Sequence, residues 1–359
     1  MSGITGTSEE EPYVSCAQCP RSCRANRSGG ESGACGETFS LRVASAGLHF
    51  GEEPVITVRG GSGTVFFTGC TLRCAFCQNY QISQQGMGAP VDSVTFTEIC
   101  LRLQALGAEN INLVTGSHHI PLIARYIEAA KTAGLSIPVA WNSSAYESVE
   151  SLERLKGLVD IWLPDLKTLN GMMARELFGV DDYPRTAKRA VRWMLESTPM
   201  RIVRSSPREE PSPAAGESSP CEKMLSGTII RHLFLPGRIQ DTALTLDWLK
   251  AHADGKACVS LMSQYTPVPF KSPPPGSSCP PSHDEKAREK KLSAFKNRLV
   301  TPQEDSALRE MIDSYGFEYL FYQDLSDDTS WLPDFSRSQP FSNSLARPIW
   351  HWSTGFIKE

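Results

Sequence analysis

The chain has 359 residues, of which 40% are apolar, and its formal net charge is −4. This apolar content can bury the core of one large soluble domain, and the charge gives no electrostatic reason to expect binding to nucleic acid or to an acidic membrane surface. No apolar run approaches the roughly 18 residues of a membrane-spanning helix, and the first eleven residues lack the basic and apolar regions of a signal peptide. We therefore expect a cytoplasmic protein with no nucleic-acid or membrane partner.

Eleven cysteines, an odd number clustered at short spacings, indicate thiolates held by metal rather than disulfides. The first group has four members, interrupted by glycines that let a short segment wrap around a metal: Cys16, Cys19, Cys23 and Cys35. Four thiolates form a complete shell for tetrahedral zinc or for an auxiliary iron–sulfur cluster, and the spacing matches neither common ferredoxin pattern. Free structural thiols are the alternative.

A second cysteine group follows the apolar, β-prone run Thr64–Phe67, which predicts a buried strand. Cys70, Cys74 and Cys77 offer three thiolates to a [4Fe-4S] cluster and leave its fourth iron open. The open iron could bind S-adenosyl-L-methionine, which an electron would split into methionine and a 5′-deoxyadenosyl radical. Phe76 and Gln78 are candidate cofactor contacts, Phe76 through its apolar surface beside an adenine. A partial zinc site or three reduced surface cysteines are the alternatives.

Beyond Cys77, helical and strand patterns alternate, which predicts a parallel sheet covered by helices. The predicted helices are Thr97–Leu106, Pro121–Ala133, Glu147–Lys156, Pro184–Leu195 and Gln303–Ser314. The predicted strands after the first are Asn110–Val114, Ile137–Trp141, Val159–Leu163, Thr228–Leu235 and Ala257–Met262.

The cysteine run and these segments resemble the radical S-adenosylmethionine superfamily, and in particular an uncharacterised branch of the relatives of pyruvate formate-lyase activating enzyme. The resemblance covers about Cys16 to Trp352, with two low-complexity interruptions. It implies a [4Fe-4S] cluster on Cys70, Cys74 and Cys77, S-adenosyl-L-methionine as cofactor, and an α/β fold with an open, partial (β/α)6 barrel of six parallel strands after a cysteine-rich N-terminal extension.

Polar residues at the carboxyl ends of barrel strands are candidate cofactor contacts. After the second strand, Thr115 and Gly116 stand where the relatives carry a Gly-Gly-Glu type motif. The adjacent His118 and His119 lack cysteine partners at zinc spacing, and a surface or hydrogen-bonding role is favoured over catalysis. Asn142 and Ser143, after the third strand, could bond a ribose or a carboxylate, or could belong to a loop and helix cap.

Two further strand ends complete the candidate set. Asp165 and Lys167 resemble an Asp-Leu-Lys motif that contacts the cofactor in the activating enzyme, with a surface ion pair as the alternative. Gln264 and Tyr265 fall where that enzyme has a Tyr-His pair, so its histidine contact does not transfer. His232 is expected to belong to the face of its strand rather than to a ligand site.

The domain organisation expected from composition is a disordered N-terminus at 1–12, a cysteine-rich metal-binding segment at 13–60, and a barrel at 61–300. Low-complexity insertions at 205–222 and 267–291, expected to form loops, interrupt the barrel. A C-terminal helix and an aromatic tail at 301–359 are expected to pack on it, with substrate recognition as the alternative role of the tail.

The most plausible function is that of a radical enzyme, classed as an oxidoreductase, which abstracts hydrogen from a protein, peptide or small molecule, with activation of a glycyl radical enzyme as one form. Such an enzyme needs an electron donor such as flavodoxin or ferredoxin. The alternative is an iron–sulfur protein that carries electrons or senses redox state. Such a carrier normally closes all four iron positions with protein ligands, so three thiolates favour the enzyme.

Overall fold

The computed structural model describes residues 10–205, 221–269, 285–326, 328–329, 331–342 and 344–358. The first nine residues and most of both low-complexity insertions predicted from the sequence therefore lie outside the described residues. Within these ranges, no helix combines the length and the apolar character needed to span a membrane.

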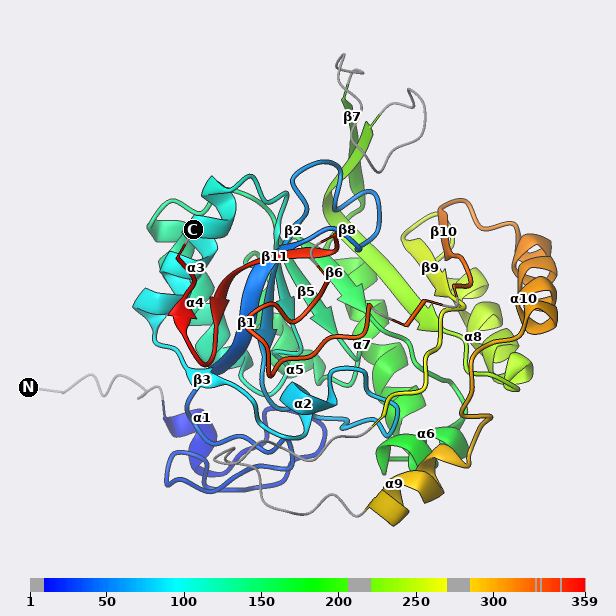
Figure 1. Cartoon of the computed structure of the whole chain (residues 1–359), viewed down its shortest axis with the longest axis horizontal. Coiled ribbons are helices and arrows are strands. Elements are labelled where there is room, and N and C mark those ends of the chain that lie inside the picture. Colours follow the sequence, from blue (N-terminus) through cyan, green and yellow to red (C-terminus); the bar gives the residue numbers. More distant parts are fainter. Residues whose placement is uncertain are drawn as a thin grey trace, which may run out of the picture.

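A curved sheet forms the centre of the molecule (Figure 1). Its parallel strands lie side by side in the order β10-β9-β8-β6-β5-β4-β2. The bounds of these strands, in chain order, are β2 Ser62–Phe67, β4 Ile111–Val114, β5 Val139–Ser143, β6 Ile161–Pro164, β8 Cys221–Leu233, β9 Cys258–Met262 and β10 Leu320–Gln323. The sheet does not close on itself, because β10 and β2 are not paired with each other.

The sheet continues beyond β2 with antiparallel strands. β1 (Arg42–His49) pairs with β2, and β11 (Ala346–His351) pairs with the other edge of β1, so an N-terminal and a C-terminal segment lie side by side here. β12 (Gly355–Phe356) pairs with β11, and β3 (Ala89–Pro90) pairs with β1. Near the other edge, β7 (Arg201–Ser205) forms an antiparallel pair with the first part of β8.

Helices cover the outer face of the parallel strands. The described helices are α1 Glu11–Val14, α2 Tyr80–Ser83, α3 Ser93–Ala105, α4 Ile120–Thr132, α5 Val149–Leu152 with a 3-10 turn at Glu153–Leu155, α6 Gly171–Phe178, α7 Tyr183–Ser197, α8 Ile239–His252, α9 Glu285–Leu292 and α10 Pro302–Tyr315. Side-chain caps mark several of their starts: Asp92 accepts a hydrogen bond from the Thr95 N–H ahead of α3, a contact typically worth about 1 kcal/mol. Thr301 and Glu304 form a capping box at α10.

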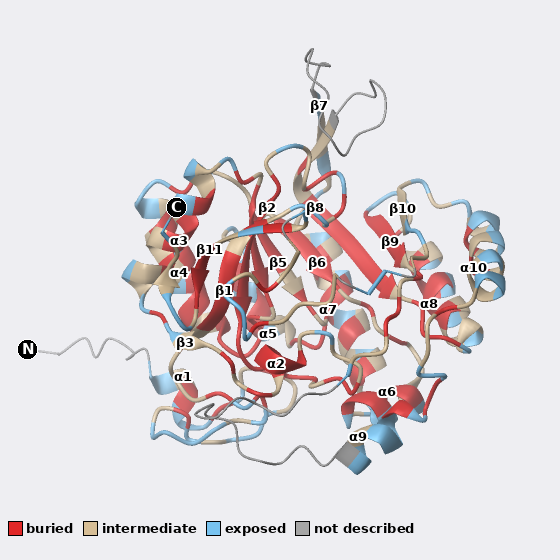
Figure 2. Cartoon of the chain, viewed as in Figure 1, coloured by how far each residue is buried: buried red, intermediate tan, exposed pale blue. Residues whose placement is uncertain are grey.

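The core has separate layers on the two faces of the sheet (Figure 2). On the outer face near β2 and β4, apolar side chains of α3 and α4, such as Phe96 and Ile123, pack against Val65 and Leu113. Inside the curve, Val55 and Ile56 from the loop between β1 and β2 join a small apolar cluster with residues of β5, β6, β8 and β9. This loop therefore fills the bottom of the barrel and leaves the opposite end free for a site.

The expected α/β class and open barrel are confirmed, and the six expected strands are present with shifted ends. The structure adds a seventh parallel strand, β10, where the sequence suggested only an apolar run. β1 was not predicted either, and it belongs to the sheet rather than to a separate N-terminal segment. Residues 285–292 form α9, so the loop expected for this part of the second insertion is wrong.

Candidate active site

A cavity of about 780 Å³ lies at the carboxyl ends of the parallel strands. Nearly every candidate that the sequence nominated for the cluster and its cofactor lines it: Cys70, Cys74, Phe76, Cys77, Gln78, Thr115, Asn142, Ser143, Asp165, Lys167, Gln264 and Tyr265. The exception is Gly116. Parallel strands bring these distant residues together because their carboxyl ends share one edge of the sheet.

The loop that carries the three cysteines leaves β2 through Gly69. This residue has φ +76°, and a Cβ there would lie 2.4 Å from the side chain of Glu37 and 3.1 Å from the Cys35 carbonyl oxygen. Only glycine permits both the left-handed backbone and this close approach. The loop then turns tightly, with the Cys77 N–H donating to the Cys74 carbonyl at 3.2 Å.

The three thiols of this loop influence one another electrostatically. Burial raises the pKa of Cys74, the neighbouring thiols of Cys70 and Cys77 raise it further, and the ammonium group of Lys167 opposes the rise. Burial also raises the pKa of Cys77, whose sulfur lies 3.3 Å from the Ser83 hydroxyl. Three thiols on one cavity wall, beside a cation, fit a cluster that must hold them ionised.

Phe76 belongs to an aromatic wall of the cavity. Its ring centroid lies 6.2 Å from that of Phe178, 6.3 Å from that of Tyr265 and 6.0 Å from that of Phe295. Tyr265 is fixed by a 2.5 Å hydrogen bond from its hydroxyl to Asn297. The wall presents apolar surface of the kind that stacks on a heterocyclic base.

The strand ends of β4 and β5 are tied together behind the cavity. Thr115 has φ +63°, and its N–H donates to the Asn142 carbonyl at 2.8 Å. The turn sends Gly116 away from the cavity and against the Trp141 ring, which a Cβ would approach to 2.6 Å. A buried carboxylate, Glu147, accepts hydrogen bonds of 2.7 Å each from Ser117, Trp141 and Ser143.

The Ser143 hydroxyl therefore donates its hydrogen bond to Glu147. The Asn142 side chain makes no such hydrogen bond to Glu147. Burial raises the pKa of Glu147, although these three donors oppose the rise. Glu147 was predicted to lie in a helix, and its role as an acceptor of three hydrogen bonds was not predicted. α5 instead begins at Val149, capped by Ser148, so the alternative reading of Asn142 and Ser143 as that helix's cap is not what the structure shows.

Asp165 and Lys167 form an ion pair of 2.9 Å on the cavity wall after β6. Burial acts to lower the pKa of Lys167, but the charges of Asp165 and Cys74 raise it above its usual value. Tyr183 fixes the backbone here: its hydroxyl accepts from the Lys167 N–H and donates to the Asp165 carbonyl, both at 2.9 Å. Partial burial beside the cysteine loop distinguishes this pair from an ordinary surface ion pair.

At the last strand ends, the Gln264 side chain accepts a 2.7 Å hydrogen bond from Gln323 of β10. The C-terminal tail supplies the adjoining wall through Trp331, Phe341 and Leu345. Part of the tail therefore lines the cavity.

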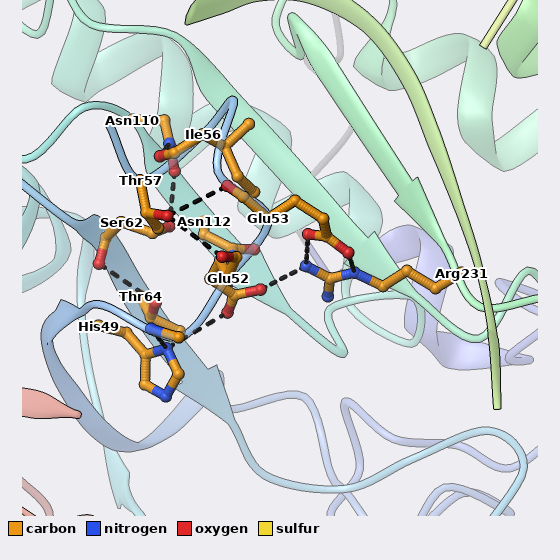
Figure 3. A network of polar contacts seen from close by, with 11 residues as sticks. His49, Glu52, Glu53, Ile56, Thr57, Ser62, Thr64, Asn110, Asn112 and Arg231 are labelled. Carbon is orange, nitrogen blue, oxygen red and sulfur yellow. Dashed lines mark hydrogen bonds and ion pairs between the residues drawn. The ribbon is translucent and has the colours of Figure 1, made fainter. Parts of the chain in front are cut away.

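A polar network that sequence reasoning missed lies deeper in the same cavity (Figure 3). Arg231 of β8 donates to Glu53 through Nε at 2.8 Å and through Nη2 at 2.5 Å, and also forms an ion pair with Glu52. Glu52 accepts from Asn112 at 3.3 Å and lies near His49. The alternation of inward and outward residues along β8 was the available signal, since it places Arg231 and His232 on opposite faces.

His232 is on the outward face, buried and hydrogen-bonded, as expected for a strand-face residue. His118 and His119 are buried as well, so a surface position for them is wrong. Neither lines the cavity. A ring nitrogen of His119 lies 2.8 Å from the guanidinium of Arg27, which agrees with a hydrogen-bonding role.

The four N-terminal cysteines lie outside this cavity but adjoin its cysteine loop, because the Cys70 N–H donates to the Cys35 carbonyl at 3.2 Å. Cys16, Cys19 and Cys35 are buried and Cys23 is exposed. Within the described ranges, no three His, Cys, Asp or Glu side chains are arranged closely enough around one point to hold a single metal ion.

Comparisons with known proteins show what the chain is similar to. A model described as the radical SAM superfamily matches residues 64–202. An uncharacterised protein from Methanocaldococcus jannaschii is 29% identical over 263 residues, which are 71% of this chain and 67% of that protein.

Solved structures give more distant matches. SuiB from Streptococcus suis, bound to the precursor peptide SuiA, has a TM-score of 0.46 and 12% identity over 72% of this chain and 47% of SuiB, so the chain spans about half the length of SuiB. A domain of pyruvate-formate lyase-activating enzyme from Bacteroides vulgatus has a TM-score of 0.35 and 10% identity over 57% of this chain and 92% of that domain. The family match begins in β2, includes the cysteine loop and ends in β7, so this part of the chain is similar to the radical SAM superfamily.

Proposed function

We propose that the protein is an iron–sulfur enzyme that reductively cleaves S-adenosyl-L-methionine in order to abstract hydrogen from a second substrate. The observation that carries this proposal is that the thiols of Cys70, Cys74 and Cys77 share one cavity with the polar strand ends. When bound, a [4Fe-4S] cluster with one open iron supplies the electron that splits the sulfonium into methionine and a 5′-deoxyadenosyl radical.

Different residues of the cavity would bind the cluster and the cofactor. The three thiolates hold the cluster, and Lys167 offsets part of their negative charge. Phe76 supplies an apolar wall for the adenine, and the Asn142 side chain and the Asp165 carboxylate offer hydrogen bonds for a ribose or an amino group. The apolar and partly enclosed walls keep water away from the reacting atoms.

The size of the cavity limits what else it holds. Its volume of about 780 Å³ falls within the usual range for a site that encloses one drug-sized ligand. We infer that the cofactor fills most of it and that a larger substrate, such as a peptide or a protein, inserts only its reacting segment. Activation of a glycyl radical enzyme, in which one glycine of a partner is oxidised, is one reaction of this form.

Electron transfer or redox sensing without cofactor cleavage is the competing function. The cavity beside the three cysteines favours the enzyme, because a carrier has no need for a ligand site next to its cluster. A flavodoxin or ferredoxin would supply the electron in either case.

The first prediction is that anaerobically reconstituted and reduced protein converts S-adenosyl-L-methionine to 5′-deoxyadenosine, measured by chromatography with mass detection. Cys74→Ala should lower this product to the level of the protein-free reaction, because two thiolates remain for the cluster. Cys100→Ala is the matched control, since Cys100 is a buried cysteine in the outer core. Turnover by Cys74→Ala equal to that of the control would contradict the proposal.

A second prediction concerns the partner. Because Asp165 and Lys167 resemble the activating enzyme whereas Thr115-Gly116 and Tyr265-Thr266 differ from its motifs, we expect cofactor cleavage with a partner other than pyruvate formate-lyase. Anaerobic incubation with candidate glycyl radical enzymes, read by electron paramagnetic resonance, tests this. A strong glycyl signal on pyruvate formate-lyase would refute the expectation, whereas a signal on another candidate would identify the partner.

A further inference from the structure

The segment before β1 folds around its four cysteines. Cys16 and Arg24 are joined by a backbone hydrogen bond of 2.9 Å, and the Ser22 N–H donates to the Cys19 carbonyl at 2.9 Å. Ser22 and Arg24 both have positive φ, at 42° and 59°. Such strained turns persist only where the surrounding structure requires them, and here they direct several thiols toward one region.

The sulfur atoms of Cys35 and Cys23 lie close to Gly33. A Cβ at this glycine would lie 3.3 Å from the Cys35 sulfur and 3.5 Å from the Cys23 sulfur. The Cys16 thiol hydrogen-bonds to Cys23. Cys19 interacts electrostatically with Cys35, Cys16 and Cys23, so all four thiols lie near one another.

A buried cation stands beside this cluster. Arg27 is 1% exposed, and its guanidinium donates to the Thr38 carbonyl at 2.8 Å, to the His118 carbonyl at 2.6 Å and to the Cys16 sulfur at 3.6 Å. The Tyr13 ring centroid lies 4.9 Å from the guanidinium, and the buried Glu37, which interacts electrostatically with Arg27, forms its ion pair with Arg42 at 3.5 Å. In the part of the chain that the structure describes, no carboxylate forms an ion pair with Arg27.

A buried charge without an ion-pair partner destabilises the folded state, because it has lost its hydration and gained no compensating charge. Ionised thiolates would supply that charge. Four thiolates around an oxidised [4Fe-4S] cluster carry a net charge of −2, so such a cluster would balance Arg27 from the side where Cys16 lies.

The cysteine segment also supports the loop of the active site. Besides the bond from the Cys70 N–H to the Cys35 carbonyl, the Arg21 side chain donates to the Thr71 carbonyl at 2.9 Å and to the Phe178 carbonyl at 2.7 Å. The segment that carries the four thiols therefore adjoins the first cysteine of the cavity.

We propose that Cys16, Cys19, Cys23 and Cys35 bind an iron–sulfur cluster, with Arg27 as its buried counter-charge. The ligand sulfurs of a cluster lie farther apart than those around a single ion, which agrees with the lack of a single-ion arrangement among the described residues. This site does not depend on the reaction proposed above, since its occupancy is measured in the absence of S-adenosyl-L-methionine. If the protein failed to cleave S-adenosyl-L-methionine, the proposal of this metal site would still hold.

The test isolates this centre by removing the other thiols. Protein with Cys70→Ala, Cys74→Ala and Cys77→Ala, purified anaerobically, is analysed for zinc, iron and acid-labile sulfide. We expect one centre per chain, and we expect its loss when Cys16→Ser and Cys19→Ser are added. Iron with acid-labile sulfide would support the proposal, whereas zinc without sulfide would overturn it. Neither metal in the first variant would overturn the proposal.

A second measurement uses the unaltered chain, so its result does not depend on whether the variants fold. Cys23 is the exposed member of the group, so a free thiol there would be open to reaction with iodoacetamide. We expect Cys23 to resist alkylation in the protein as isolated and to react after chelation, as read by peptide mass spectrometry. Immediate alkylation of Cys23 in metal-replete protein would overturn the proposal independently.

Discussion

His232 shows how a single buried residue supports the candidate site without entering it. Its Nδ1 lies 2.7 Å from the Leu166 carbonyl oxygen and its Nε2 lies 3.0 Å from the Thr242 hydroxyl. Leu166 stands between Asp165 and Lys167, so the imidazole fixes the backbone that presents the ion pair to the cavity. Burial lowers the pKa of His232 to about 4, and the ring is neutral in the folded protein at pH 7.

This pKa makes stability depend on pH. The unfolded chain binds a proton on His232 near its usual pKa of about 6.5, whereas the folded chain resists protonation until about pH 4. The stabilising contribution is therefore complete above pH 6.5 and is lost as the pH falls toward 4. Between pH 7 and pH 5 the loss from this residue is about 2 kcal/mol.

We expect the free energy of unfolding, measured with urea, to fall more between pH 7 and pH 5 for the unaltered chain than for His232→Gln. The glutamine keeps a donor and an acceptor but does not titrate. Other buried histidines remain in both proteins and cancel in the comparison. An equal fall in the two proteins would show that His232 is not protected from protonation.

At the scale of elements, the order and type of the parallel strands could be predicted because each is a short apolar run followed by a turn. Knowing where such strands end was enough to bring Asn142, Asp165 and Gln264 to one cavity. The direction in which each side chain points could not be predicted as well from the sequence. Gly116 follows Thr115 directly in sequence, yet the positive φ of Thr115 sends it behind the wall.

Elements that depend on distant partners could not be predicted in this way. β1 is buried along most of its length and lacks the alternation of a half-exposed strand, and its partner β11 lies some three hundred residues away in the chain. α9 is a charged run without an apolar face, and Arg288 within it donates to the Ala75 carbonyl of the cysteine loop at 2.8 Å. Such tertiary contacts leave no local pattern.

At the scale of the whole molecule, the loop between β1 and β2 joins the N-terminal part of the sheet to the far side of the barrel. Its Val55 carbonyl accepts from the Met224 N–H of β8 at 2.8 Å, and its Glu53 pairs with Arg231 of the same strand. Burial acts to raise the pKa of Glu53, but Arg231 holds it below its usual value. The loop thereby fixes the floor of the cavity on strands that are not its neighbours in sequence.

The last prediction tests this closure through stability. Glu53→Gln should lower the free energy of unfolding by about 2 to 4 kcal/mol, because it leaves the buried Arg231 with only Glu52 as a charged partner. Asp181→Asn is the matched control: Asp181 pairs with Arg175 on the surface, where both side chains are more than half exposed, and its loss should cost less than about 1 kcal/mol. Adding Arg231→Met to Glu53→Gln should recover part of the loss, since the uncompensated cation is then removed. Urea unfolding of the four proteins at pH 7 measures these differences, and a loss for Glu53→Gln no larger than that for Asp181→Asn would mean that the ion pair does not hold the loop against the barrel.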